Sequence, residues 1–167
     1  MAVVIRPYRD GDAAGIVQIS RDNGRFYTRL APDYFRLPDE DGFVELIERD
    51  GDWRDAAENL ALVADVDGHV AGYLEATVHA PLETARWQAQ RDLGETRLQI
   101  NFVGTADTYK RKGVASRLVE AAEAWGRSKG AAVAICDTYV DSPLSVPFWE
   151  RRMGYERRAI VFRKALT

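Results

Sequence analysis

The stretch from residue 98 to residue 130 constrains the fold most, because it combines a strand, a basic loop and an amphipathic helix in that order. The mostly apolar run 100–103 is typical of a buried strand. From Val114 onward, apolar residues recur at the spacing that places them on one face of a helix. Residues 110–115, KRKGVA, form the loop between the two. The sequence therefore predicts a strand, a tight basic turn and a helix that ends at Gly130.

The loop itself has the chemistry of an anion-binding site. A helix N-terminus offers backbone N–H groups without intrahelical acceptors and a partial positive charge. Gly113 allows a ligand to approach the backbone and Ala115 keeps the first turn narrow, while Lys110, Arg111 and Lys112 add positive charge. The loop thus indicates a phosphate or pyrophosphate site. A basic first turn on an ordinary strand–helix unit is the plainer alternative, and neither the P-loop spacing nor the G-x-G-x-x-G dinucleotide fingerprint is present.

Composition and charge narrow the class of protein. With 167 residues, 46% of them hydrophobic and 29% charged, the chain is expected to form one folded domain. A net charge of −3 gives no general reason to expect nucleic-acid binding. Cys136 is the single cysteine, which excludes an internal disulfide and is typical of the cytosol; it is interpreted as a core residue. No run is long enough for a membrane span and the N-terminus has no signal-peptide pattern, so a cytoplasmic protein without a membrane partner is expected.

The remaining elements follow from local patterns. Further strands are expected at residues 2–8, 59–66, 69–79, 97–106, 131–140 and 155–164, the last as a strand or hairpin. A helix capped by Asp10 or Asp12 is expected to reach about Ser20. Residues 81–96 are expected to form a loop or a short helix that could border the acceptor site.

Segment 69–79 has one polar face. It follows Asp67-Gly68, a strong turn signal, and is expected to form a hairpin with segment 59–66. Alternation predicts that Val70, Leu74, Ala76 and Val78 face one way, and that Tyr73, Glu75, Thr77 and His79 face the other. The polar face indicates either simple exposure to solvent or a polar site near the middle of the sheet.

Residues 39–58 are rich in acidic side chains, which are Asp39, Glu40, Asp41, Glu45, Glu48, Asp50, Asp52, Asp55 and Glu58. Phe43, Leu46 and Ile47 lie among them at helical spacing. One interpretation is the solvated face of a helix. The other is an acidic wall that gathers a cationic acceptor molecule.

The basic loop and a second segment, PFWERRMGY at residues 147–155, together resemble the GCN5-related N-acetyltransferase (GNAT) superfamily. Its signature is Q/R-x-x-G-x-G/A, and Lys110 stands where Gln or Arg is usual. Residues 142–155 are similar to the family segment N-x-x-A-x-x-F-Y-E-K-x-G-F. The resemblance covers about residues 59–164. It implies a single GNAT domain over residues 1–167, of the α/β (α+β type) class, with a mixed, mostly antiparallel sheet and helices on both faces.

The resemblance also implies acetyl-CoA as cosubstrate and no metal. Its pantetheine arm would run beside the strand at residues 97–106 like an added strand, in the splay between that strand and the one at 131–140. Its pyrophosphate would rest on the basic loop. Gly104 is expected to form a bulge that frees backbone groups for this ligand. The cofactor-binding residues implied are Val103, Gly104, Thr105, Lys110, Arg111, Lys112, Gly113, Val114, Ala115, Ser116 and Ser142.

The sequence departs from the family pattern where catalytic residues are often found. The tyrosine that commonly protonates the thiolate aligns with Trp149, whose indole has no acidic proton to give. The asparagine that often contacts the cofactor aligns with Ser142. The glutamate that serves as base in the histone-modifying branch aligns with Gln99.

Replacement candidates come from the residues themselves. Attack on a thioester needs a neutral amine, hence a base, and the leaving thiolate can use an acid. Glu75 is the candidate base, directly or through water, with His79 as a second base candidate. Tyr139, near the end of its strand, is the candidate acid.

The predicted function is acetyl-CoA-dependent transfer to a primary amine of a small molecule or peptide, by direct attack in a ternary complex. A cationic acceptor such as a polyamine or an aminoglycoside is the one to test first. Dimers are frequent in the resembled family, although the sequence has no interface signature. Two alternatives stay open, a catalytically weak acyl-CoA-binding or sensing module and a phosphate-ligand protein outside the family.

Overall fold

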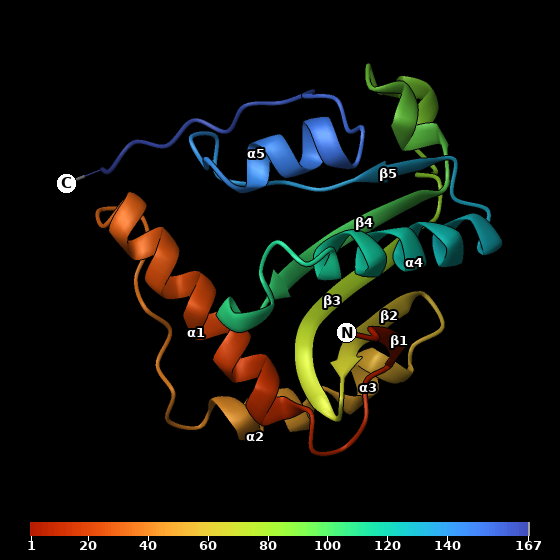
Figure 1. Cartoon of the computed structure of the whole chain (residues 1–167). Coiled ribbons are helices and arrows are strands. Elements are labelled where there is room, and N and C mark those ends of the chain that lie inside the picture. The colour runs from red at the N-terminus through yellow and green to blue at the C-terminus, as the bar shows by residue number, and fades with distance from the viewer. Residues whose placement is uncertain (167) are drawn as a thin grey trace. The chain divides into compact units, whose positions relative to one another are not determined.

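The computed structural model describes residues 1–166, and the chain divides into two compact units, the first formed by Met1–Cys136 and the second beginning at Asp137 (Figure 1). The first unit holds the whole sheet. The single domain expected for the chain stays a prediction. No helix within residues 1–166 combines the length and the apolar character needed to cross a bilayer.

Five strands form one sheet in the order β1 (Val4–Pro7), β2 (Asn59–Val66), β3 (His69–His79), β4 (Arg97–Thr105) and β5 (Val133–Ile135). The first four pair antiparallel with their neighbours, whereas β4 and β5 are parallel. The mixed, mostly antiparallel sheet predicted from the sequence is confirmed. The strand expected at 131–140 is much shorter than predicted, because only three of its residues pair with β4.

Helices cover both faces of the sheet, as predicted. On one face, α1 (Ala13–Leu30), α2 (Phe43–Arg49) and α3 (Gly51–Asp55) enclose a core cluster that includes Ile19, Ile47 and Tyr73. On the other face, α4 (Val114–Ser128) packs so closely that a Cβ on Gly72 would lie 2.6 Å from Val114. Figure 1 shows α1 and α4 on either side of the strands.

Helix α1 differs from the sequence prediction in its length and its cap. It continues ten residues beyond Ser20, to Leu30, because its later turns pack against the loop that follows, where a Cβ on Gly24 would lie 2.4 Å from Pro38. Asp12 precedes the helix, but its carboxylate makes no capping hydrogen bond. Instead it accepts hydrogen bonds from Arg6 at 2.7 and 2.9 Å and from the Arg9 N–H at 2.7 Å.

The predicted hairpin between β2 and β3 is confirmed, with Asp67 and Gly68 both in the left-handed region at φ 52° and 81°. The face predicted for Val70 is wrong. A register shift leaves Ala71 unpaired between Val70 and Gly72, and Val70 therefore packs with Tyr73 against the α1 core cluster. Single insertions of this kind exchange the two faces of a strand.

Short helical turns occupy the connections. The segment after β3 contains η1 (Ala85–Trp87) and η2 (Arg91–Gly94), and the segment after β4 contains η3 (Asp107–Tyr109). In the second unit, α5 (Ser145–Pro147) leads into a π-helical turn, η4 (Phe148–Arg152).

The strand or hairpin predicted at 155–164 is wrong, because the segment has no regular structure. Its apolar residues Ile160, Val161 and Phe162 are 68, 85 and 91% exposed. Alternation would place Ile160 and Phe162 on one face, but no strand of the described residues pairs with this segment, and a strand is not stable without a paired neighbour.

Candidate functional site

The edge of β4 that faces away from β3 is open over most of its length. Pairing with β5 covers only Arg97 to Gln99, while β3 pairs with β4 as far as Thr105. On this edge, the backbone N–H and C=O groups of residues 100–105 therefore pair with no strand among the described residues. This is the geometry that an extended ligand can use by pairing with the edge.

Alternation decides which residues present those groups. The Ala106 N–H donates to the Ala71 carbonyl of β3 at 3.0 Å. In an antiparallel pair, residues point their N–H and C=O alternately toward and away from the partner strand. Val103 and Thr105 consequently direct theirs to the open edge, and Gly104 directs its own to β3.

The bulge expected at Gly104 is elsewhere. Gly104 pairs regularly with Tyr73, and the register shift leaves Asn101 of β4 unpaired. Gly104 is needed for a different reason, because a Cβ there would lie 2.5 Å from Ile19 on α1 and 2.9 Å from the Phe102 ring. Its missing side chain lets α1 approach β4 closely.

The open edge leads through η3 into the loop before α4, which we call the cofactor loop (Lys110–Gly113). Arg111 and Gly113 both adopt left-handed conformations, with φ 62° and 79°. The first helical hydrogen bond of α4 runs from the Arg117 N–H to the Gly113 carbonyl at 3.2 Å. The N–H groups of residues 114–116 therefore precede the intrahelical ladder and can point at an anion. Nothing lies within 4 Å of the position of a Gly113 Cβ, so the space beside the loop is open.

Two of the three basic side chains of the cofactor loop are held by η3. The Lys110 ammonium lies 2.5 Å from the Asp107 carboxylate, and the Lys112 ammonium donates to the Thr108 carbonyl at 2.8 Å. Within residues 1–166 the Arg111 guanidinium makes no hydrogen bond or ion pair. Arg111 is the cation best placed to meet an incoming phosphate without first breaking another contact.

Glu75, the predicted base, lies on β3 and is partly shielded from solvent. Its carboxylate accepts a hydrogen bond from the Tyr73 hydroxyl at 2.8 Å. Burial raises the pKa of the Glu75 carboxyl, and the negative charge of Asp50 adds to this, while the Tyr73 hydrogen bond and the charge of Arg54 act in the opposite direction. Burial also raises the pKa of Tyr73, so its hydroxyl stays protonated and acts as the donor. The polar face of β3 is therefore shielded from solvent at Tyr73 and Glu75 and becomes exposed toward His79.

Register separates the two base candidates. Glu75 pairs with Phe102, beyond the point where β5 leaves β4, whereas His79 pairs with Arg97 inside the part that β5 covers. His79 is also exposed at the end of its strand. Of the two base candidates, only Glu75 lies level with the open part of β4, on the neighbouring strand β3.

The second unit holds the other residues singled out by the sequence. Ser142 is buried, and its hydroxyl accepts the Ser145 N–H at 3.1 Å at the start of α5. Trp149 is buried and packs on Tyr155 with ring centroids 4.9 Å apart. The Tyr139 carbonyl accepts the Ser142 N–H at 3.0 Å. Tyr139 itself is partly exposed.

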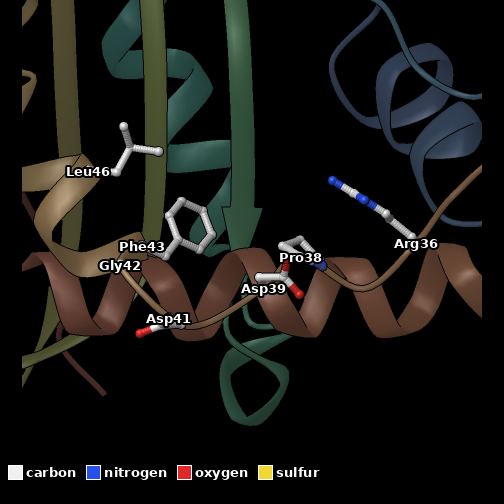
Figure 2. Close-up of a pocket in the computed structure, with 7 residues that line it drawn as sticks. All are labelled: Arg36, Pro38, Asp39, Asp41, Gly42, Phe43 and Leu46. Atoms are coloured by element: carbon white, nitrogen blue, oxygen red, sulfur yellow. The ribbon is translucent and has the colours of Figure 1, made fainter.

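Two hollows flank the α1 side of the first unit. One, of about 350 Å³, is formed by the loop after α1 and the start of α2, with Asp39, Asp41 and Arg36 among its lining residues (Figure 2). Arg21 of α1 holds this loop by donating to the Pro38 carbonyl at 2.5 Å. The other, of about 420 Å³, is lined by residues of β1, β2 and α3 and includes Ala61, the direct partner of Glu75 on β2. Both take acidic side chains from segment 39–58, where the helix predicted from Phe43, Leu46 and Ile47 is present as α2, followed by α3.

Sequence reasoning missed two residues at this site. Tyr73 had been assigned to the same face as Glu75, and that shared face was the available signal for their pairing. Asp22 carried no signal, since its partner Asp107 lies 85 residues away.

Comparison with known proteins identifies relatives of this arrangement. The sequence family described as the Acetyltransferase (GNAT) family matches residues 24–155. A search of curated protein sequences gave no match. Among solved structures, a transcriptional regulator from Bacillus halodurans C-125 is 20% identical, with a TM-score of 0.74 over 99% of this chain and 100% of the other.

Two further structures contain ligands. AAC(6')-Iy in complex with the bisubstrate analog CoA-S-monomethyl-acetylneamine is 18% identical, with a TM-score of 0.64 over 99% of this chain and 100% of the other. An aminoglycoside acetyltransferase from an uncultured soil metagenomic sample, in complex with sisomicin, is 15% identical, with a TM-score of 0.61 over 99% and 97%. At these identities the likeness shows the fold.

Proposed function

This chain belongs to the GNAT family of acetyltransferases, and from that premise we propose that it transfers the acetyl group of acetyl-CoA to a primary amine in a ternary complex. The observation that carries the proposal is the continuity of the open β4 edge with the left-handed cofactor loop at the start of α4. An extended arm ending in a pyrophosphate needs these two features in this order. Membership also removes the alternative of a phosphate-ligand protein outside the family.

The residues present fit coenzyme A. Val103 and Thr105 would pair with the pantetheine amides, and the N–H groups of residues 114–116, together with Arg111, would bind the pyrophosphate. Acetyl-CoA supplies an activated acetyl group with a thiolate leaving group. Ser142 stays a proposed further contact of the cofactor.

Glu75 is proposed as the base that makes the acceptor amine neutral. An alkyl amine with a pKa of about 10.4 is almost entirely protonated near pH 7, and freeing it costs about 4 to 5 kcal/mol. A carboxylate whose pKa is raised by burial accepts a proton more readily than an exposed one. The position of Glu75 beside the open edge supports this role, directly or through one water molecule. Tyr139 is proposed as the acid that protonates the departing thiolate.

A cationic amine is the proposed class of acceptor. The hollow in Figure 2 and the hollow beside Ala61 are both bordered by carboxylates, which attract a polyamine or an aminoglycoside through long-range charge. The relatives with acetylneamine-CoA and sisomicin bind molecules of this kind.

The first experiment is calorimetric titration of acetyl-CoA into wild type, Gly113→Glu and Gly130→Glu. Both glycines have positive φ and open space around a Cβ, one at each end of α4, so both substitutions carry the same backbone cost. Only Gly113→Glu places a carboxylate at the cofactor loop. We expect wild type and Gly130→Glu to bind, and Gly113→Glu to lose at least about a hundredfold in affinity.

Absence of binding by wild type would refute the proposal. Binding without turnover over a broad panel of amines would instead favour the catalytically weak sensing module. Turnover is then tested with Glu75→Gln, where we expect a loss of about 10² or more in kcat. Unchanged rates at every pH would remove Glu75, and unchanged rates in Tyr139→Phe would remove Tyr139.

A further inference from the structure

Asp22 is a buried carboxylate in the middle of α1, only 5% exposed. It accepts hydrogen bonds from the Gln18 amide at 2.8 Å and from Arg25, both on its own helix. Its third donor is the backbone N–H of Asp107, at 3.0 Å, from the segment between β4 and the cofactor loop. Burying a carboxylate is unfavourable unless several donors satisfy it. The three donors around Asp22 meet this requirement, and one of them comes from a distant segment of the chain.

We propose that Asp22 is a positioning residue for coenzyme A, which it affects by fixing the cofactor loop to α1 without touching the ligand. The inference rests on the proposed function. A direct contact is excluded by charge, because a carboxylate repels a pyrophosphate. Asp22 is moreover enclosed and paired with Arg25.

The connection from Asp22 to the loop is continuous. Asp107 begins η3, and its side chain holds Lys110 at 2.5 Å. Thr108 of the same turn holds Lys112 through its carbonyl at 2.8 Å. Both lysines of the cofactor loop are thus tied to η3, and η3 is tied to α1 by the Asp22 hydrogen bond.

Helix α1 follows the cofactor site along one of its faces. Ile19 packs where Gly104 of β4 has no side chain. One turn later Asp22 holds Asp107. One turn further, the ring centroid of Phe26 lies 5.8 Å from the Lys110 ammonium. Residues three and four apart share a helix face, so a single face of α1 contacts β4, η3 and the cofactor loop in succession. Figure 1 shows the connection between β4 and α4 beside the middle of α1.

The anchor matters because the loop conformation is unfavourable by itself. Arg111 is a non-glycine residue at φ 62°, in the left-handed region that side chains with a Cβ disfavour. Without the Asp22 hydrogen bond the loop would populate other conformations. If its competent fraction fell to about a tenth, coenzyme A would bind about tenfold more weakly.

The test compares Asp22→Ala with Asp12→Ala, a matched control. Asp12 is also buried, at 6% exposure, and also accepts hydrogen bonds from an arginine and a backbone N–H, but it lies just before the N-terminus of α1 and, among the described residues, makes no hydrogen bond or ion pair with the cofactor loop. Dissociation constants are measured by calorimetry for coenzyme A and for pantetheine, which lacks the pyrophosphate. We expect Asp22→Ala to weaken coenzyme A about tenfold and pantetheine less than about twofold. Asp12→Ala should change neither.

Three results would overturn the proposal. Equal loss for coenzyme A and pantetheine would indicate general damage, and an equal loss in both variants would indicate lost stability. Unchanged coenzyme A binding in folded Asp22→Ala would remove the anchor. If Asp22→Ala does not fold, amide hydrogen exchange at Asp107 in Asp22→Asn decides, because the proposal requires faster exchange there than in Asp12→Asn. Failure of the proposed function is recognised separately, since wild type itself would then not bind coenzyme A.

Discussion

Gly104 provides a quantitative test of how closely α1 approaches β4. A methyl group at this position would lie 2.5 Å from Ile19 Cγ2, and 2.9 and 3.0 Å from two atoms of the Phe102 ring. Contacts this short force one of the elements to move, and overpacking of a filled core costs about 1 to 3 kcal/mol. For a protein of this size each kcal/mol lowers Tm by about 2 to 4 °C. Gly104→Ala should therefore lose about 2 kcal/mol of unfolding free energy and about 4 to 8 °C in Tm.

The assay is urea unfolding and thermal melting of Gly104→Ala beside Gly51→Ala. Gly51 has negative φ and nothing within 4 Å of its Cβ position, so its substitution should leave Tm unchanged or slightly raised. A second comparison uses Ile19→Leu, which removes the clashing Cγ2 and keeps the side-chain volume. In that background the cost of Gly104→Ala should fall by about 1 kcal/mol. A Gly104→Ala protein as stable as Gly51→Ala, or an Ile19→Leu background without effect, would refute the close approach.

Three further predictions concern charge. Tyr73→Phe removes the hydrogen bond that favours ionised Glu75, so the pKa of Glu75 should rise and the acid limb of the pH–rate profile should move to higher pH. Tyr8, which follows β1, neither bonds to Glu75 nor changes its pKa, so Tyr8→Phe should leave the acid limb in place. Arg111→Asn, which tolerates the left-handed conformation, should keep Tm within about 2 °C but weaken acetyl-CoA binding, with a larger ratio at about 0.05 M than at about 0.3 M salt. Hydrogen bonds from the Arg6 side chain and the Gly68 N–H lower the pKa of Asp65 on β2. The contribution of Asp65 to stability is therefore complete above the ordinary pKa of an aspartate and is lost as the pH falls through the lowered pKa of the folded state. Tm should therefore drop less between about pH 5 and pH 3 in Asp65→Asn than in wild type.

Local features of the site were readable from the sequence. The cofactor loop and the start of α4 were placed correctly because turn conformations and helix periodicity depend on residues only a few positions apart. The β2–β3 hairpin was found for the same reason. Glu75 was identified as polar within a strand, but its partial burial was not, because burial depends on how distant segments pack around β3.

The sequence by itself determined the class of fold, the family and the position of the turn before α4, each through local periodicity, turn chemistry or a motif. Tertiary structure alone decided the rest. The bulge lies at Asn101 and not at Gly104, whose missing side chain instead admits Ile19 of α1. Asp22 reaches Asp107 across 85 residues, a contact that no local pattern encodes. Secondary structure follows from interactions between near neighbours, whereas the pairing of buried polar groups is fixed only when distant segments pack and exclude water.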